Sequence, residues 1–467
     1  MGKKRAEYKM IPSAVSKVIE NNSSEITSPL TLIEPGQAPE SSVVKMVLMH
    51  DVLGRMQVIL PANSMLDVDT LNSCLGRDLV ALSPDDLDSL RVKYSLSDLP
   101  ALPGITGLPS VVDASVLSMD IVYLESGEQG KLIKLDKQLF SELLADAREE
   151  RFSVPIASID INLNAPAQDL EQIEDAIKKF TYLRIKQRLE DTLEVPPLPQ
   201  TAQKIIHLRV DPDAGVNELA DIVEADPSLS AQVVSWAASS FYSAPGKIKS
   251  VHDAIMRVLG FDLVMNLSMG LSLGRTLQLP NEQPEGYTPY WHQAIWMATA
   301  TGALINVIPR EHRPGFGLAY LSGLLHNFGY LVLAHVFPPH FSLICRYIEA
   351  NPHIDPSYVE HFLLGITREQ VGSTLMSVWN MPEEVIVALR HQKSAGFDGV
   401  NSDFANILYI ARNLLSERGL SVGPTQPIPD DMYERMQLDP VKAKEVMDEL
   451  LASRDEILQM AGMMEKA

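Results

Sequence analysis

The fold of the second half of the chain is decided by one segment, Gly323-Leu324-Leu325-His326-Asn327-Phe328-Gly329-Tyr330-Leu331-Val332. These residues predict an apolar helix that carries an adjacent histidine and asparagine shortly before a glycine. Two polar side chains in such a helix either hydrogen-bond inside the core or belong to a functional site. His326 and Asn327 are therefore the first candidate site residues.

The sequence on both sides of this segment is helical in pattern. Glycine and proline, which cap or interrupt helices, mark the predicted boundaries. They stand at Asp226-Pro227, Gly260, Gly274, Pro314-Gly315, Pro338-Pro339, Met381-Pro382 and Gly419, and Asp439-Pro440 begins a last helix. Towards the N-terminus, apolar residues between Leu170 and Leu183 recur every three or four positions, which predicts a connecting helix. The second half is predicted to be all-α.

The first half mixes strands and short helices. Val43–Met49 and Met56–Leu60 predict a hairpin, and Ser83-Pro84 predicts a capped helix start. Further strands are predicted at 110–113, 121–124 and 131–135, and further elements at Asp69–Leu75 and Leu79–Leu82. This pattern is typical of an α/β domain with a mixed sheet and helices.

Length and composition limit the classes of protein that fit. At 467 residues the chain exceeds a single core of about 250 to 300 residues. We predict an α/β domain at 1–155, a connecting helix at 156–194, a helical domain at 195–400, and helices at 401–467 that pack on it. With 39 basic and 60 acidic residues, the net charge of −21 disfavours binding to DNA.

The chain has only two cysteines, far apart in the sequence, which favours a cytoplasmic protein. No apolar run of about 20 residues stands out, so we expect no contact with a membrane.

A second candidate site lies in the α/β domain. Lys45 stands in the middle of an apolar strand, and a glycine- and proline-rich loop, residues 99–109, leads into the strand at 110–113. Glycines let a loop backbone approach a ligand closely and offer amide donors. The alternative is that both features are structural. Lys45 would then be a lysine that reaches solvent from the edge of a sheet, and the loop would be a tight turn.

Four segments of this half, Ser42–Val47, Gly54–Ala62, Gly107–Asp113 and Gly127–Ile133, resemble the YbaK/prolyl-tRNA-editing family of aminoacyl-tRNA deacylases. The resemblance implies that Lys45 stabilises charge at the ester of a mischarged tRNA. It also implies that Gly104, Gly107 and Pro109 line the aminoacyl pocket. The family loop begins with Pro-Gly, whereas this chain has Pro100-Ala101, and the added methyl group alters the pocket.

Six segments of the second half resemble an HDOD domain, a relative of the metal-dependent HD phosphohydrolases. They are Pro196–Pro199, Ile222–Ser230, Ser239–Tyr242, Ala254–Gly260, Tyr290–His292 and Trp379–Pro382. Such hydrolases hold divalent ions with histidines and an aspartate.

Here His292 and His326 remain, but the aspartate position holds Asn327, Arg368 replaces a histidine, and His391-Gln392 replaces a histidine pair. A guanidinium is always protonated and cannot bind a cation. We therefore expect a degenerate site without metal, and no cofactor.

Three functions follow from these resemblances. The first is a bacterial signalling or regulatory protein whose HDOD domain binds a signalling partner without catalysis and is joined to an editing-like domain. The second is an aminoacyl-tRNA deacylase, with tRNA bound at the N-terminal domain and a regulatory HDOD domain. The third, a metal-dependent phosphohydrolase, is disfavoured by the missing ligands.

Overall fold

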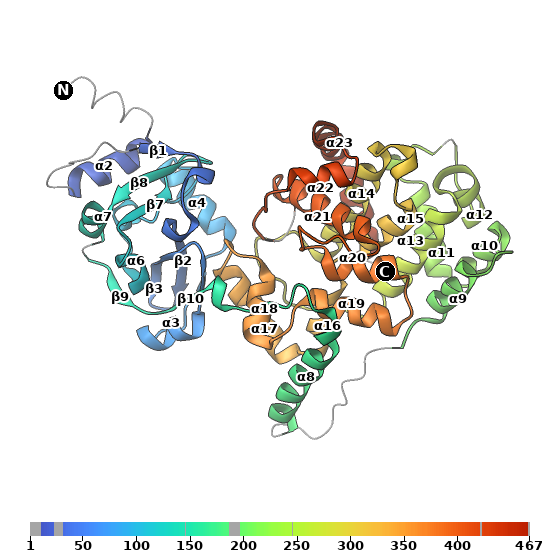
Figure 1. Cartoon of the computed structure of the whole chain (residues 1–467), viewed down its shortest axis with the longest axis horizontal. Helices are drawn as coiled ribbons and strands as arrows, with labels where there is room; N and C mark the ends of the chain where they lie inside the picture. The colour runs from blue at the N-terminus through green and yellow to red at the C-terminus, as the bar shows by residue number, and fades with distance from the viewer. Residues whose placement is uncertain are drawn as a thin grey trace. The chain divides into compact units, whose positions relative to one another are not determined.

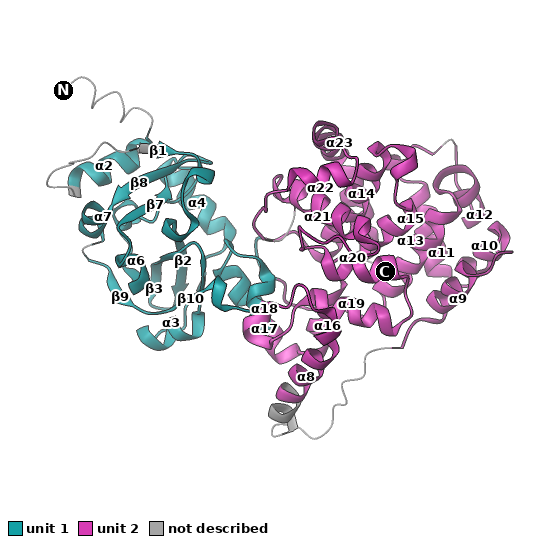
Figure 2. Ribbon diagram, viewed as in Figure 1, with its two compact units in different colours: residues 1–160, 284–286, 342–359 teal, residues 161–283, 287–341, 360–467 magenta. Residues whose placement is uncertain are grey.

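The computed structural model describes residues 11–22, 31–144, 146–185, 197–244, 246–420 and 423–465. The chain forms two compact units (Figure 2). Unit 1 comprises residues 1–160, 284–286 and 342–359, and unit 2 comprises 161–283, 287–341 and 360–467. Unit 1 contains a mixed sheet with helices and unit 2 is helical, so the predicted fold class is confirmed. The four predicted domain boundaries stay predictions.

Unit 1 is built on a five-stranded sheet with the order β5-β2-β3-β6-β9. Its strands are β2 (Val44–Asp51), β3 (Gly54–Pro61), β5 (Val80–Ala81), β6 (Ser110–Asp113) and β9 (Arg148–Glu150). The predicted hairpin is confirmed, since β2 and β3 are antiparallel and Lys45 lies opposite Leu60. Strands β3, β6 and β9 are parallel, which makes the sheet mixed.

Two smaller sheets complete the unit. One has the order β1-β8-β7 and the other pairs β10 with β4. Their strands are β1 (Thr31–Ile33), β4 (Ser64–Leu66), β7 (Ile121–Glu125), β8 (Leu132–Asp136) and β10 (Ser153–Pro155). The α-helices are α2 (Ser13–Asn22), α3 (Val68–Leu75), α4 (Pro84–Tyr94), α5 (Pro103–Thr106), α6 (Ala114–Leu117) and α7 (Lys137–Leu143). Helix α7 packs on β7 and β8, as Figure 1 shows.

Local sequence signals explain the helix ends in unit 1. The Ser83 hydroxyl accepts a hydrogen bond from the backbone N–H of Asp86, with Pro84 in the first turn of α4. Asp67 caps α3 in the same way, and Gly76 ends that helix in a left-handed conformation with φ of 63°. The predicted helix starts and stops therefore agree with the structure to within two residues.

Unit 2 contains most of the described helices. They are α8 (Asp169–Ile185), α9 (Gln200–Arg209), α10 (Val216–Glu224), α11 (Pro227–Ala237), α12 (Val251–Ala254), α13 (Phe261–Gly274), α14 (Tyr290–Val307), α15 (Phe316–Leu325), α16 (Phe328–Val336), α19 (Arg368–Val378), α20 (Glu383–His391), α21 (Ser402–Ser416), α22 (Asp430–Arg435), α23 (Pro440–Ala452) and α24 (Arg454–Glu465). Helices α17 (Pro338–Ala350) and α18 (Pro356–Leu364) each contribute residues to both units.

Short single-turn elements join these helices and strands. The 3-10 turns are η2 (Pro35–Gln37), η3 (Glu40–Ser42), η4 (Ile156–Ser158), η5 (Pro166–Gln168), η6 (Ser240–Tyr242) and η8 (Arg310–His312), and η7 (Ile255–Leu259) is a π-helical turn. The π-helical turn follows α12 directly and ends at Gly260, where the sequence predicts a boundary.

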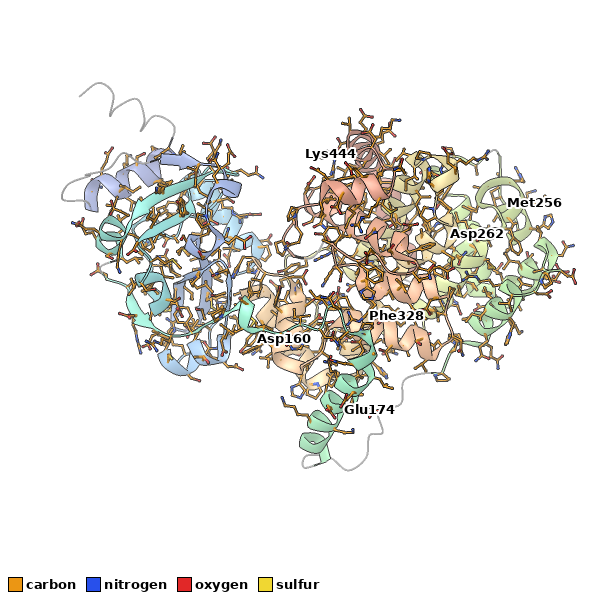
Figure 3. All side chains as sticks on the ribbon, viewed as in Figure 1. Asp160, Glu174, Met256, Asp262, Phe328 and Lys444 are labelled. Atoms are coloured by element: carbon orange, nitrogen blue, oxygen red, sulfur yellow. The ribbon has the colours of Figure 1, made fainter. Side chains whose placement is uncertain are left out.

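The deciding segment forms two helices rather than the single helix that its apolar pattern predicts. Helix α15 ends at Leu325 and α16 begins at Phe328, which Figure 3 labels, so His326 and Asn327 lie at the junction. Asn327 leaves helical geometry, with φ of −107° and ψ of 17°. At such a junction the last carbonyl groups of one helix and the first N–H groups of the next have no partner within their own helix. Polar side chains are needed there to form hydrogen bonds with them.

The core of unit 2 packs α13, α14 and α15 closely together (Figure 1). Gly323 lies against the backbone of Ala298 on α14, where an added Cβ would come within 2.7 Å of the Ala298 Cα. Asp262 on α13, labelled in Figure 3, accepts a hydrogen bond of 2.8 Å from the N–H of Gly317 on α15. Burial and these close approaches fix the position of the junction.

Helices α15 and α16 together span an apolar stretch of 21 residues, Phe316–Val336, although the sequence predicts no run of about that length. By length and composition alone this stretch could cross a membrane, and among the described residues it is the one such candidate. Of its most apolar part, 83% is buried inside the fold. This degree of burial is typical of the core helices of a globular domain.

Candidate functional site

The Lys45 site lies where two sheets of unit 1 meet. Lys45 comes from β2, and its Nζ forms an ion pair with the carboxylate of Glu125 at the end of β7. The Lys45 side chain is 35% exposed and that of Glu125 is 14% exposed. The ammonium is thus reachable from solvent, but it already has a neighbouring negative charge that would compete with an anionic ligand.

A histidine from the second half of the chain joins this site. His353 belongs to unit 1, and its Nε2 lies 2.9 Å from the carbonyl oxygen of Ser64. Because that carbonyl can only accept, Nε2 carries the proton in the neutral ring. Burial lowers the pKa of His353 to about 4, and the positive charge of Lys45 acts in the same direction. His353 is therefore a neutral side chain within electrostatic reach of Lys45.

The loop of the predicted aminoacyl pocket is held by Gln57. The Gln57 amide donates to the carbonyl oxygens of Leu108 (3.0 Å) and Pro103 (3.3 Å), and the Gln57 backbone N–H donates to that of Pro109 (2.9 Å). Gly107 ends α5 with φ of 67°, and its N–H donates to the carbonyl of Pro103.

Gly104 lies within α5, and Ala101, the departure from the family loop, is completely buried. The loop is held by these hydrogen bonds, and the N–H of Gly107 is engaged within it. The roles predicted for Lys45, Gly104, Gly107 and Pro109 remain predictions.

The second site is a buried polar centre in unit 2. The guanidinium of Arg368, at the start of α19, pairs with the carboxylate of Glu360 on α18, and the Arg368 backbone N–H donates to Glu360 over 2.9 Å. Arg368 Nη1 also donates to Asn327 Oδ1 over 2.9 Å. Burial opposes the charge of Arg368, but Glu360 outweighs it and raises the pKa of Arg368 above its usual range. A permanent cation thus lies at the junction of α15 and α16.

His326 lies beside this cation as a neutral ring. Its Nδ1 is 2.8 Å from the carbonyl oxygen of Gly323, and Gln392 Nε2 donates to the His326 carbonyl over 2.7 Å. Burial lowers the pKa of His326 to about 4, although the bond to Gly323 opposes this, and the positive charges of Arg412 and Arg368 lower it further. The same charges would repel a divalent cation.

Two predicted members of the degenerate centre make other contacts. His292 pairs with Glu465 of α24 at 3.5 Å, whereas the adjacent Gln293 accepts a hydrogen bond of 3.1 Å from Asn327. His391 stacks on Phe397 with a centroid separation of 3.8 Å, and burial lowers its pKa to about 4.

Sequence reasoning missed two members of the centre, Gln293 and Glu360. Glu360 has a visible signal, an acidic residue in the apolar run Tyr358-Val359-Glu360-His361-Phe362.

The residues of the HD-like centre do not fit a metal ion. Among the described residues, no group of three or more histidine, cysteine, aspartate or glutamate side chains is arranged to hold one. Arg368 and Asn327, which the sequence resemblance matches to an imidazole and a carboxylate of the HD enzymes, supply neither ligand, and Glu360 is already paired with Arg368. The donor set therefore favours hydrogen bonding over metal coordination.

A cavity of about 280 Å³ lies in unit 2 near His292. Its wall includes Arg275, Trp291, Met464 and Glu465. Arg275 is already bonded to Asp226, Ser228 and Gln232. The cavity is thus largely apolar with a neutralised arginine, a lining that does not specify a class of ligand.

Two family models match separate ranges of the chain. The model of the HDOD domain matches residues 195–395. The model of the aminoacyl-tRNA editing domain matches residues 26–143. The first range contains the buried Arg368 centre, and the second contains Lys45 and its loop.

Several proteins are similar to this chain over different lengths. The crystal structure of a "Putative signal transduction protein" from Marinobacter aquaeolei VT8 is 50% identical, covers 97% of this chain and 99% of its own, and has a TM-score of 0.89. An HDOD domain protein with unknown function from Geobacter sulfurreducens is 20% identical over 63% of this chain and 99% of its own, with a TM-score of 0.50, and shows the fold alone.

An "Uncharacterized protein" of Treponema pallidum (strain Nichols) is 24% identical over 213 residues. This match covers 44% of the present chain, which spans only 38% of the length of that relative.

Proposed function

This chain belongs to the HDOD-domain proteins that carry an N-terminal aminoacyl-tRNA editing domain, and we propose that it is a bacterial regulatory protein whose HDOD domain acts by binding. The proposed partner is a signalling protein, and the proposed location is the cytoplasm, without binding to a membrane or to DNA. The similarity to a protein whose name is "Putative signal transduction protein" supports this proposal at a coarse level.

The observation that carries the proposal is the buried pair of Arg368 and Glu360. Its fixed positive charge supports the proposal, because hydrolysis of a phosphoester at an HD centre would need a divalent cation, which such a charge repels. Asn327 adds a hydrogen bond but no negative charge. A centre of this kind is suited to holding helices together, and it leaves the helical surface as the functional part of the domain.

The test for a silent HD centre uses the full chain. The protein is incubated with Mn²⁺, desalted, and examined by elemental analysis and by hydrolysis of bis(p-nitrophenyl) phosphate. We expect less than a stoichiometric amount of metal and no hydrolysis above the rate of a heat-denatured control. One bound ion per chain together with turnover would show that the domain is a phosphohydrolase.

The binding role is tested by affinity capture from a lysate of the source bacterium. The full chain is used as bait, and an unrelated acidic protein of similar net charge serves as control. We expect a signalling protein to be retained at physiological salt and to be confirmed by direct titration with the purified partner. Absence of any specific partner under these conditions would contradict the proposal.

A second function, aminoacyl-tRNA deacylation, is favoured by one observation: Lys45 stands in strand β2 of an editing-type domain with its ammonium partly exposed. The ion pair with Glu125 works against it, because that carboxylate must be displaced or screened before Lys45 can stabilise an anionic substrate. Alanyl-tRNAPro is the substrate to test, with Lys45→Ala as the control. Equal stability of the ester with either protein would exclude this function.

A further inference from the structure

The hydrogen bonds of strand β4 reach two different parts of the chain. On one edge β4 pairs with β10, and the N–H of Asp67, directly after β4, donates to the carbonyl of Phe152 on the same side. Alternate residues of a strand direct their backbone groups to opposite edges. Ser64 and Leu66 therefore face the other edge of β4, which we call the outer edge.

The partners on the outer edge come from the second half of the sequence. The Asn351 side chain accepts a hydrogen bond of 2.6 Å from the N–H of Leu66 and donates one of 3.0 Å to its carbonyl. His353 Nε2 donates to the carbonyl of Ser64 over 2.9 Å. All four residues belong to unit 1. One carboxamide thus pairs with both backbone groups of Leu66, as a neighbouring strand would.

Tyr347 makes similar bonds at the start of helix α3. Its hydroxyl donates to Asp67 Oδ1 over 2.8 Å and accepts from the N–H of Asp69 over 3.1 Å. Asp67 is the N-cap of α3, so Tyr347 bonds to the residue that begins this helix. Tyr347, Asn351 and Leu66 are each at most 1% exposed. Because these groups are shielded from water, losing one partner leaves the other without a hydrogen bond.

A second stretch of the second half joins the same unit. Residues 284–286 belong to unit 1, and the N–H of Glu285 donates to the carboxylate of Glu349 over 2.8 Å. Gly286 has a φ of 82°, and an added Cβ there would lie 2.8 Å from Cγ of Pro84, the first residue of α4. Figure 2 draws residues 284–286 and 342–359 in the colour of unit 1. We call these two stretches the completing segments.

Sequence and packing assign the completing segments to different parts of the protein. Both lie inside the range matched by the HDOD model, 195–395, and outside the range matched by the editing model, 26–143. Their packing places them in unit 1. Without Asn351 and His353 the outer edge of β4 would be an unpaired strand edge, which proteins generally cover.

We propose that the editing-like unit is a composite fold, which the completing segments from the HDOD range close at the outer edge of β4. The HDOD range then has a structural function besides the binding of a partner, because it contributes part of the unit that carries Lys45. This inference goes beyond the proposed function and holds whether or not either half is catalytic. Substitutions within 342–359 therefore act on unit 1.

Hydrogen–deuterium exchange in the full chain tests the composite fold without a substrate or a partner. Asn351→Ala removes both bonds to Leu66, and we expect the Leu66 amide to exchange about tenfold faster than in the wild type. Tyr347→Phe removes a single hydroxyl, and the Asp69 amide should exchange faster by a similar factor. Because Tyr347→Phe keeps the aromatic ring, it tests the same unit if Asn351→Ala proves insoluble.

Asn413→Ala is the matched control, because Asn413 makes the same kinds of bond within unit 2. The Asn413 side chain accepts a hydrogen bond of 2.8 Å from the N–H of Gln426 and donates one of 2.9 Å to the carbonyl of Tyr409. It is as deeply buried as Asn351, with 1% exposed. Asn413→Ala should accelerate exchange at Gln426 and leave residues 64–69 at the wild-type level.

Three results would overturn the composite fold. The first is unchanged exchange at residues 64–69 in both Asn351→Ala and Tyr347→Phe. The second is a larger change in α14 and α21 than at residues 64–69, which would assign residues 342–359 to the helical unit. The third is equal acceleration at residues 64–69 in Asn351→Ala and Asn413→Ala, which would mean general destabilisation. Because the readout needs no metal, tRNA or signalling partner, the composite fold can fail while the proposed function stands, and the reverse.

Discussion

At the scale of single residues, Arg368 determines what the HD-like centre can do. Its guanidinium is bonded to Glu360 and Asn327, and it lies 5.0 Å from the centre of the Tyr330 ring. Hydrogen bonds and a neighbouring aromatic face satisfy a buried cation on several sides. The positive charge of this centre therefore comes from a side chain of the protein and not from a bound ion.

If Arg368 replaces a metal ion, reversing the substitution should restore metal binding. The double variant Arg368→His, Asn327→Asp supplies an imidazole and a carboxylate beside His326 and frees Glu360 to coordinate. We expect this variant to bind about one Mn²⁺ per chain, measured by elemental analysis after dialysis, and to gain thermal stability when Mn²⁺ is added.

The single variant Arg368→Met serves as control for the metal experiment. It removes the cation without adding ligands, so it should bind no metal and should lose about 3 to 5 kcal/mol of unfolding free energy, because Glu360 is left buried and unpaired. Metal binding by the single variant, or none by the double variant, would contradict this account.

At the other site, Glu125 is the acidic partner of Lys45, as Glu360 is of Arg368. In Glu125→Gln the ammonium loses its neighbouring negative charge, and we expect the affinity for a tRNA acceptor-stem minihelix to rise about two- to fivefold at low salt. Fluorescence anisotropy measures this change, and it should disappear in Glu125→Gln, Lys45→Ala. Equal affinity of the wild type and Glu125→Gln would show that Lys45 does not meet nucleic acid.

The sequence identifies some of these residues and misses others for a physical reason. Motif order along the chain is enough to select Lys45, His326, Asn327 and Arg368. Glu360, Gln293 and His353 are partners from other elements, and which element delivers a partner depends on packing. Sequence spacing carries no information on such contacts unless the fold is already known.

At the scale of elements, α16 and α19 cross at two glycines. A Cβ on Gly329 would lie 1.8 Å from the carbonyl oxygen of Arg368, and one on Gly372 would lie 3.0 Å from the backbone nitrogen of Gly329. The close crossing brings the first residue of α19 against the start of α16. The position of Arg368 beside Asn327 therefore depends on glycine at 329.

Gly329→Ala should separate these helices. We expect a loss of about 3 kcal/mol of unfolding free energy, measured by urea denaturation, because the backbone of α19 must move to make room. Gly462→Ala is the matched control, since an added Cβ there meets no atom within 4 Å and the position lies within α24. It should be neutral or slightly stabilising. Similar losses in both variants would contradict the packing argument.

The ends of the helices show where signals from neighbouring residues are sufficient to predict the structure. Ser83 with Pro84 predicts the start of α4 correctly, because a cap involves only neighbouring residues. The break between α15 and α16 is not predictable in this way, because residues 323–332 are apolar enough to continue a helix. The segments on either side of the break pack closely on α14 and α19, and these contacts come from distant parts of the sequence.

At the scale of the whole molecule, the chain should lose stability at mildly acidic pH. Burial lowers the pKa of His326, His353 and His391 to about 4 in the folded chain, from 6.5 for a free histidine. Between these values the unfolded chain binds more protons than the folded chain. The free energy of unfolding therefore falls as the pH drops from 6.5 towards 4.

Net charge cannot account for such a loss, and this makes the prediction specific. The chain carries −21 at pH 7 and has an isoelectric point near 4.9, so self-repulsion decreases as the pH falls from 6.5 to about 4.9. The variant His326→Gln removes one of the three histidines. Between pH 6.5 and 4 its free energy of unfolding should fall by roughly 3 kcal/mol less than that of the wild type. Urea denaturation of both proteins at half-unit pH steps measures the difference. Parallel curves for the two proteins would show that His326 takes up a proton in the folded state and would contradict the prediction.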